Sequence, residues 1–308
     1  MSVAESVTAV PARPADRLDW RAVLILIGCC ACWGVNQVAI KIANAGISPI
    51  LQVGLRSLLA AVLVFWWARA RGVALFNRDG TLWAGLFAGL LFGLEFLIIY
   101  VGLDHTTASR GVVFLYLSPF VVAFGAHYLI PGDRLSAVKL IGLTAALGGL
   151  VVAMWEGFVA PGQPTLLGDA LMLLAAVIWG ATTVLVRATS LKSAAPEKTL
   201  FYQLVVSGLL LPPASHYLGE PGIVELSPQV LLAFAYTFLI VAFVSYIAWF
   251  WLVRNYPPTR VTAFTFLSPV FGVAAGNLML GEPFTESLGI ALALVAFGIF
   301  LVNWPRRA

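Results

Sequence analysis

Ten long apolar stretches with short connections between them constrain this chain of 308 residues more than any other feature. They fall at about residues 21–43, 49–68, 81–103, 108–130, 135–155, 166–188, 198–218, 229–253, 259–280 and 286–304. A membrane-spanning helix needs about 20 apolar residues, so each stretch can cross a bilayer. With 61% hydrophobic and 10% charged residues, and a mean hydropathy of +0.95, the chain cannot cover a water-exposed surface. We therefore expect an all-α integral membrane protein with ten transmembrane helices, and we exclude a soluble enzyme, a disordered chain and a fibrous repeat.

The basic residues predict the orientation of these helices. If the N-terminal tail, residues 1–20, is cytoplasmic, all but three of the 18 Lys and Arg residues lie at cytoplasmic ends. Lys41 and Arg110 lie at outer ends, and Arg56 lies within a span. Positively charged loops resist translocation. We expect a multi-pass protein of a plasma membrane of the bacterial inner-membrane type, with both termini cytoplasmic and no cleavable signal. These loops account for the net charge of +4, so no nucleic-acid partner is expected.

The second half of the chain repeats motifs of the first half in the same order. The matches pair Trp33, Gly34 and Lys41 with Trp179, Gly180 and Arg187, Gln52 with Gln203, Arg110 with Arg260, and Leu117-Ser118-Pro119 with Leu267-Ser268-Pro269. We therefore expect two repeats of five helices each, residues 21–155 and 166–304. Because five is odd, the second repeat must enter the membrane from the opposite side. Such inverted-topology repeats are typical of transporters with a site at the membrane midplane.

These motifs resemble a known family of membrane proteins. The Trp-Gly pair followed by a basic residue, the Leu-Ser-Pro triplet and the Gly-Glu pair that closes the ninth stretch resemble the drug/metabolite transporter superfamily, and specifically its EamA family. The resemblance covers about residues 20–304 and is strongest to amino-acid exporters of the YddG type. It implies two inverted five-helix repeats, cytoplasmic termini and export of small metabolites by alternating access. The two repeats differ in detail, because the fourth stretch ends in Pro131-Gly132-Asp133 and the ninth in Gly281-Glu282-Pro283.

Two ionisable residues lie deep inside predicted spans. Arg56 and Glu95 are at about the same depth, roughly 10–12 Å below the predicted outer surface at 1.5 Å per helical residue. Ionisable groups inside a bilayer are unfavourable, so each needs a partner or a function. One interpretation is an ion pair that joins two helices; the other is that Glu95 changes its protonation during transport and couples export to protons. The sequence leaves both open.

Polar and aromatic residues share faces of two repeat-related helices. Trp33, Asn36 and Gln37 are on one face of the first span, and Trp179, Thr182 and Thr183 repeat this spacing in the sixth. These stripes predict either the walls of a substrate cavity or polar contacts between helices. We predict the cavity. Its complete set of candidate substrate-binding residues is Trp33, Asn36, Gln37, Tyr100, Trp179, Thr182, Gln203 and Tyr246.

Two prolines, Pro119 and Pro269, lie inside predicted spans at repeat-related positions. A proline within a helix removes a backbone hydrogen bond and kinks the helix. The pair therefore predicts either hinges that bend during transport or static kinks that shape the bundle.

The motifs that the sequence lacks narrow its function further. It contains no phosphate-binding loop of the ATPase type and no hydrolase motif. Its three cysteines, Cys29, Cys30 and Cys32, have no partners at metal-ligand spacing, so we expect neither a metal nor another cofactor. We expect a transporter that exports amino acids, apolar or aromatic ones first, or related small metabolites. The alternatives are a passive channel for small metabolites and a membrane-embedded enzyme. The oligomeric state is not indicated.

Overall fold

Residues 17–304, apart from 104, 107, 160–165 and 281–285, are described by a computed structural model of the chain. Its helices are α1 (Trp20–Ala43), α2 (Pro49–Ala70), α3 (Leu82–Leu103), α4 (Ala108–Leu115), α5 (Ser118–Leu129), α6 (Ala137–Val159), α7 (Leu166–Ala188), α8 (Pro196–Tyr217), α9 (Pro228–Tyr236), α10 (Tyr246–Asn255), α11 (Pro258–Ala263), α12 (Leu267–Leu280) and α13 (Glu286–Asn303). Two short 3-10 helices are η1 (Ser190–Ser193) and η3 (Phe264–Phe266), and η2 (Thr237–Ser245) is a π-helix. The single β-bridge in the described chain joins Ile47 to Ile223.

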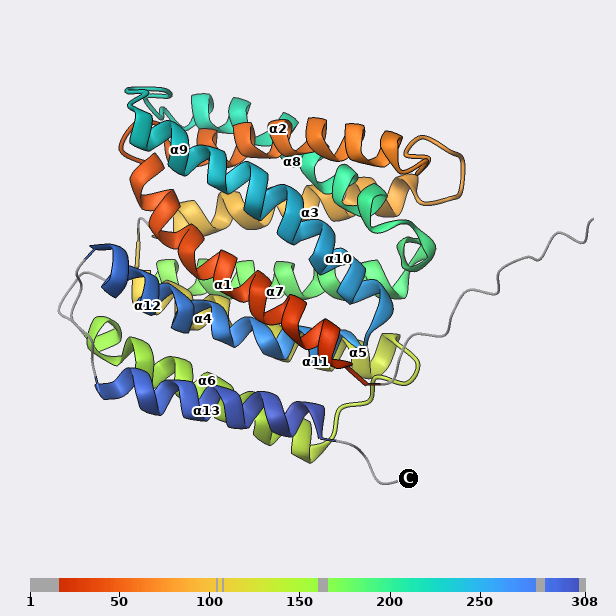
Figure 1. Cartoon of the computed structure of the whole chain (residues 1–308), viewed down its shortest axis with the longest axis vertical. Coiled ribbons are helices and arrows are strands. Elements are labelled where there is room, and N and C mark those ends of the chain that lie inside the picture. Colours follow the sequence, from red (N-terminus) through yellow and green to blue (C-terminus); the bar gives the residue numbers. More distant parts are fainter. Residues whose placement is uncertain (1–16, 104, 107, 160–165, 281–285, 305–308) are drawn as a thin grey trace, which may run out of the picture.

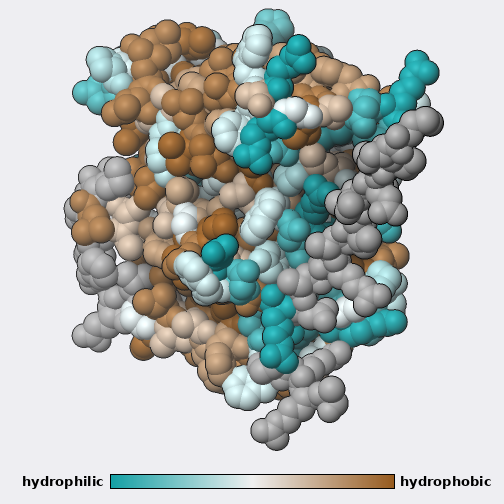
Figure 2. Space-filling model, turned by 45° about the vertical axis from the view of Figure 1, so that its right-hand side comes forward, coloured by the Kyte–Doolittle hydropathy of each residue, from teal (hydrophilic) through white to brown (hydrophobic). Residues whose placement is uncertain are grey.

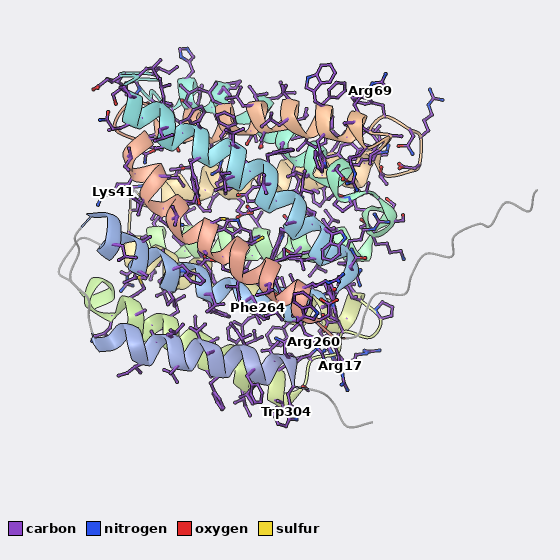
Figure 3. The ribbon with its side chains drawn as sticks, in the orientation of Figure 1. Arg17, Lys41, Arg69, Arg260, Phe264 and Trp304 are labelled. Atoms are coloured by element: carbon purple, nitrogen blue, oxygen red, sulfur yellow. The ribbon has the colours of Figure 1, made fainter. Side chains whose placement is uncertain are left out.

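The long helices run roughly along one direction and form a bundle (Figure 1). The start of α1 and the end of α13 lie at the same end of this bundle, which we call the terminal end; the opposite end carries the α1–α2 and α8–α9 connections. Figure 2 turns the terminal end toward the viewer, and hydrophilic residues gather there while hydrophobic residues cover much of the flank. Arg17, Arg69 and Arg260 lie at the terminal end and Lys41 lies at the opposite end (Figure 3).

The composition and length of the helices define an integral membrane protein. Seven continuous helical segments of the described chain are long and apolar enough to cross a membrane: Trp20–Ala43, Pro49–Ala70, Leu82–Leu103, Arg110–Leu129, Ala137–Trp155, Leu166–Ala188 and Pro228–Asn255. Many large apolar side chains on them are exposed, including Trp66 at 64% and Trp83 at 80%, as expected of a surface that contacts lipid. The other expected spans are weaker: α8 has 22 residues but includes Lys198 and two prolines, and α12 and α13 are shorter.

Two of the predicted spans, the fourth and the ninth, are interrupted. The fourth divides into α4 and α5 at Tyr116 and Leu117, and Pro119 lies in the first turn of α5. The ninth divides into α11, η3 and α12, and Pro269 lies in the first turn of α12. A proline in the first turn of a helix removes no hydrogen bond that the helix would otherwise make. Each proline therefore begins a helix after a break, where the sequence predicted a kink within a continuous one.

Small residues bring the helices into close contact. On α3, Gly85, Gly89 and Gly93 face α8, and a methyl group at any of them would overlap atoms of α8. On α6 and α13, Gly142 and Gly298 lie against each other in the same way. Close approach through small residues is the usual basis of helix association in membranes, because lipid provides no hydrophobic drive for it.

A buried lysine ties α8 to the α2–α3 loop at the terminal end. Lys198 is 1% exposed, and its ammonium donates to Asp79 Oδ2 at 2.9 Å and to Asn77 Oδ1 at 2.7 Å. The Thr81 hydroxyl donates to Asp79 Oδ1 at 2.6 Å. The hydrogen bonds from Thr81 and then from Lys198 hold the pKa of the Asp79 carboxyl well below its ordinary value. The ionised carboxylate therefore stabilises the folded state.

We expect Asp79→Asn to lower the melting temperature of the detergent-solubilised protein in a pH-dependent way. Because the folded-state pKa is depressed, the stabilisation by Asp79 is complete above the unfolded-state pKa, about 4, and is lost as the pH falls towards the folded-state value. The difference between wild type and variant should therefore be constant near neutrality and shrink below about pH 4. Thermal unfolding at several pH values measures it. Glu225→Gln, which neutralises an exposed carboxylate, serves as the control. A difference that grows on acidification would contradict the assignment.

Candidate functional site

A cavity of about 330 Å³ lies inside the bundle. Its walls come from α1, α2, α3, α4, α7, α8, η2 and α10, together with Tyr116 between α4 and α5. All eight candidate binding residues of the sequence analysis line it: Trp33, Asn36, Gln37, Tyr100, Trp179, Thr182, Gln203 and Tyr246. Arg56 and Glu95 line it too, whereas Pro119 and Pro269 do not. This size is within the range of pockets that take small molecules.

Trp33 is held in the wall by contacts with η2 and α10. Its indole Nε1 donates to Ser245 Oγ at 2.9 Å, and that hydroxyl donates to the Val241 carbonyl at 2.6 Å. The ring of Trp33 packs edge-on against Trp249 and Tyr246, with centroid distances of 5.2 and 6.3 Å. Ser245 ends the π-helix η2, a wider helical turn that is rare and frequent at functional sites. The sequence predicted a membrane-spanning helix over residues 229–253 but not this π-helical part of it.

Trp179 occupies the repeat-related position on α7 with different neighbours. Its ring packs edge-on against Tyr116 at a centroid distance of 5.8 Å. The Thr182 hydroxyl donates to the Ile178 carbonyl at 2.8 Å, which fixes the orientation of this side chain along the helix. Tyr116 was missed by the sequence analysis, although it lies directly before the repeated Leu-Ser-Pro triplet that was singled out.

The glycine after each of these tryptophans explains why the Trp-Gly pair recurs. Gly34 lies against Phe271 and Gly272 of α12, and Gly180 lies against Val121 of α5. At both positions a methyl group would overlap the neighbouring helix. The glycine thus lets two helices approach closely while the tryptophan beside it faces the cavity.

Arg56 and Glu95 share the cavity without pairing. They are 2% and 6% exposed, and the ion pairs of the described residues include none between them. The Arg56 guanidinium lies over the ring of Phe96, with Cζ 4.7 Å from the centroid, and its Nε and Nη2 atoms are buried without hydrogen-bond partners. The ion pair that equal depth suggested is therefore not formed, because depth along a helix does not decide which way a side chain turns. Nearby in the wall, the side-chain amide of Gln203 and Asn36 Oδ1 are also buried without partners.

Exposed residues of the cavity wall show where the cavity opens. Asn44, the C-cap of α1, and Leu103, the last residue of α3, line the cavity and are exposed, as is Gln37. These helix ends lie away from the terminal end of the bundle (Figure 1). The cavity therefore opens on that side.

At the terminal end, polar contacts join the elements beyond the cavity. Arg187 donates a hydrogen bond to the Arg254 carbonyl, which joins the last turns of α7 and α10. Asp133 accepts from Lys139 Nζ at 2.6 Å and from the Thr259 backbone N–H at 3.0 Å, which joins the α5–α6 loop to α6 and α11. We call these two sets of contacts, of Asp133, Lys139 and Thr259 and of Arg187 and Arg254, the terminal-end network.

A polytopic helical membrane protein with a polar and aromatic cavity at its centre is the class that this fold and site define. The model of the EamA-like transporter family matches residues 20–155 and again residues 166–304, so the chain belongs to that family. This agrees with the family resemblance of its repeated motifs.

Other proteins are similar to this chain in sequence, and one crystal structure is similar to it in fold. A WAT1-related chloroplastic protein of Arabidopsis thaliana is 29% identical over 94% of this chain and 70% of its own length. The uncharacterized transporter YoaV of Bacillus subtilis is 23% identical over 91% of this chain and 96% of its own, and the uncharacterized inner membrane transporter YedA of Escherichia coli is 23% identical over 88% and 87%. A crystal structure that is 20% identical covers 91% of this chain and 96% of its own with a TM-score of 0.79, which shows a shared fold.

Proposed function

We propose that the protein is a carrier that exports amino acids, apolar or aromatic ones first, from a bacterial-type cytoplasm by alternating access. The observation that carries this proposal is a cavity with aromatic and polar walls that opens toward one end of the bundle and is followed by the terminal-end network at the other. A carrier needs a site that opens to one side at a time, whereas a channel needs a path open to both. Aromatic rings beside amide and charged groups suit ligands with an apolar side chain and polar ends.

The proposed architecture is ten spans in two inverted repeats, residues 21–155 and 166–304. Contacts between helices support it, because they recur when the repeats are exchanged. The helix α1 packs against α12 as α7 packs against α5, and α3 packs against α7 as α9 packs against α1. The pairs α2 with α8 and α6 with α13 each join equivalent spans of the two repeats. The breaks before Pro119 and Pro269 are also repeat-related, which supports their proposed role as hinges.

The proposed orientation has both termini in the cytoplasm of a bacterial-type inner membrane. The basic residues Arg17, Arg69 and Arg260 lie at the terminal end, as the positive-inside rule requires of a cytoplasmic side (Figure 3). The cavity then opens outward. Single cysteines introduced at the two chain ends, on a background without Cys29, Cys30 and Cys32, should react only after the membrane is made permeable. Labelling of either end from outside in intact cells would refute this orientation.

Vesicles reconstituted with the purified protein separate the three functional classes. We expect saturable uptake of labelled L-phenylalanine that unlabelled amino acid on the opposite side accelerates. Flux that rises linearly with concentration and shows no such acceleration would indicate a channel. Chemical change of the label would indicate an enzyme.

Within this proposal, Glu95 couples transport to protons. Glu95 lies buried in the cavity without an ion pair to Arg56. Its carboxyl group can therefore gain or lose a proton when access to the cavity switches from one side of the membrane to the other. The titratable and charged groups that share the cavity wall are Arg56, Tyr100, Tyr116 and Tyr246, from four different parts of the chain.

We expect Glu95→Gln to abolish the pH dependence of transport, because glutamine keeps the shape of the side chain and cannot ionise. Uptake of L-phenylalanine, measured between about pH 5.5 and 8.5, should vary with pH in wild type and be constant in the variant. Glu225→Gln, at an exposed position, should behave as wild type. Retention of the pH dependence with normal flux in Glu95→Gln would disprove the coupling role.

A further inference from the structure

We propose that the Arg56 guanidinium is the binding site for the carboxylate of the transported molecule, an inference that rests on the proposed transport function and assigns one end of its substrate. Arg56 belongs to the second turn of α2 and lines the cavity. It is 2% exposed, and Nε and Nη2 are buried without partners. Buried N–H donors of a charged group are strongly unfavourable when they have no acceptor, unless a bound molecule supplies one.

Other buried cations of the described chain have their partners within the protein. Lys139 is 2.6 Å from Asp133 and Lys198 is 2.9 Å from Asp79. Arg56 differs, because Glu95 on the neighbouring helix forms no ion pair with it. The Tyr246 hydroxyl is its one hydrogen-bonding neighbour among the described residues, and Nε and Nη2 keep no acceptor. The face of Phe96 attracts the guanidinium but accepts no N–H···O hydrogen bond. The unmet donors of Arg56 therefore point to an anion that is absent from the empty protein.

The chemistry of the wall favours a monocarboxylate over a phosphate. A guanidinium presents donors in a planar fork that matches the two oxygens of a carboxylate. Arg56 and Glu95 are the charged side chains among the described residues of the wall, so their formal charges cancel. A doubly charged phosphate would be left with uncompensated charge beside Glu95. An amino acid brings one negative and one positive group, and its polar end meets the unpaired amide of Gln203 in the same wall.

The test compares three probes that differ only in their charged ends: L-phenylalanine, 3-phenylpropanoate without the amine and 2-phenylethylamine without the carboxylate. Dissociation constants are measured by calorimetry on purified full-length protein. For Arg56→Met we expect binding of both carboxylates to weaken about 100-fold and binding of the amine to change less than about two-fold. Arg56→Lys should recover part of the loss, since it keeps the charge without the fork. Arg69→Met, which removes an exposed arginine from the same helix, should bind all three probes as wild type does.

Stability without ligand distinguishes binding from a structural role. Because Arg56 forms no ion pair in the empty protein and two of its buried donors have no acceptor, Arg56→Met should melt at the same temperature as wild type or higher. A large decrease would show that Arg56 stabilises the fold and would contradict the inference.

The remaining outcomes separate this inference from the proposed function. Equal weakening of the amine and the carboxylates, unchanged carboxylate binding in a folded Arg56→Met, or failure of wild type to bind either carboxylate overturns the inference. If reconstituted vesicles transport L-phenylalanine in these cases, the proposed function stands alone. If carboxylates bind through Arg56 but no amino acid is transported, the inference stands and the proposed function fails.

Discussion

Replacement of Asp133 with alanine should destabilise the protein by about 3–5 kcal/mol, because it leaves a buried lysine charge without its partner. Asp133 is 3% exposed, and its carboxylate accepts from Lys139 and from the backbone of Thr259. Lys139 is 8% exposed and has, besides Asp133, the Arg134 carbonyl at 2.9 Å. The substitution therefore removes one hydrogen-bond acceptor from the Lys139 ammonium and one from the Thr259 backbone N–H, and both residues are largely buried. Unfolding in mixed micelles at increasing denaturant fraction measures the change.

A double variant tests whether the unpaired charge is the cause. Asp133→Ala combined with Lys139→Met removes both charges, and apolar groups tolerate burial, so much of the lost stability should return. Lys192→Met, which removes an exposed lysine, is the control and should change the stability little. An Asp133→Ala variant within about 1 kcal/mol of wild type would show that water reaches Lys139.

Replacement of Trp179 with alanine should weaken the binding of L-phenylalanine by about 10- to 100-fold, because a substrate loses the apolar face of the indole. The ring is half-buried, packs against Tyr116 and lines the cavity. The loss should appear in the half-saturation concentration of vesicle uptake and in the calorimetric dissociation constant alike.

Two controls separate substrate contact from packing at Trp179. Trp83→Ala removes an indole that is 80% exposed on α3, and it should leave binding and folding unchanged. Trp179→Phe keeps an aromatic ring and should retain most of the affinity. If Trp179→Ala fails to fold, or folds and binds as wild type does, the side chain acts in packing and not in binding.

Much of the cavity was predictable from the sequence because its residues obey local rules. Trp33, Asn36 and Gln37 are spaced so that they share one face of a helix whatever surrounds it. That their side chains point to the same side therefore follows from spacing alone. Duplication of the motif around Trp179 showed which faces of two distant helices are equivalent. These arguments selected eight residues that do line one cavity. They could not find Tyr116, because it lies in a helix break, and they did not predict the π-helix that ends at Ser245.

The sequence by itself determined that the chain is helical, lies in a membrane and has two related halves, since length, hydropathy and repeated motifs do not depend on contacts between distant residues. Only the tertiary structure decided that Arg56 and Glu95 do not pair, that Asp133 joins the α5–α6 loop to α11, and on which side the cavity opens. The physical reason is that a side-chain contact depends on how each helix is rotated and shifted against its neighbours. The packing of small residues such as Gly34 and Gly180 sets those rotations, and it acts between segments far apart in the chain.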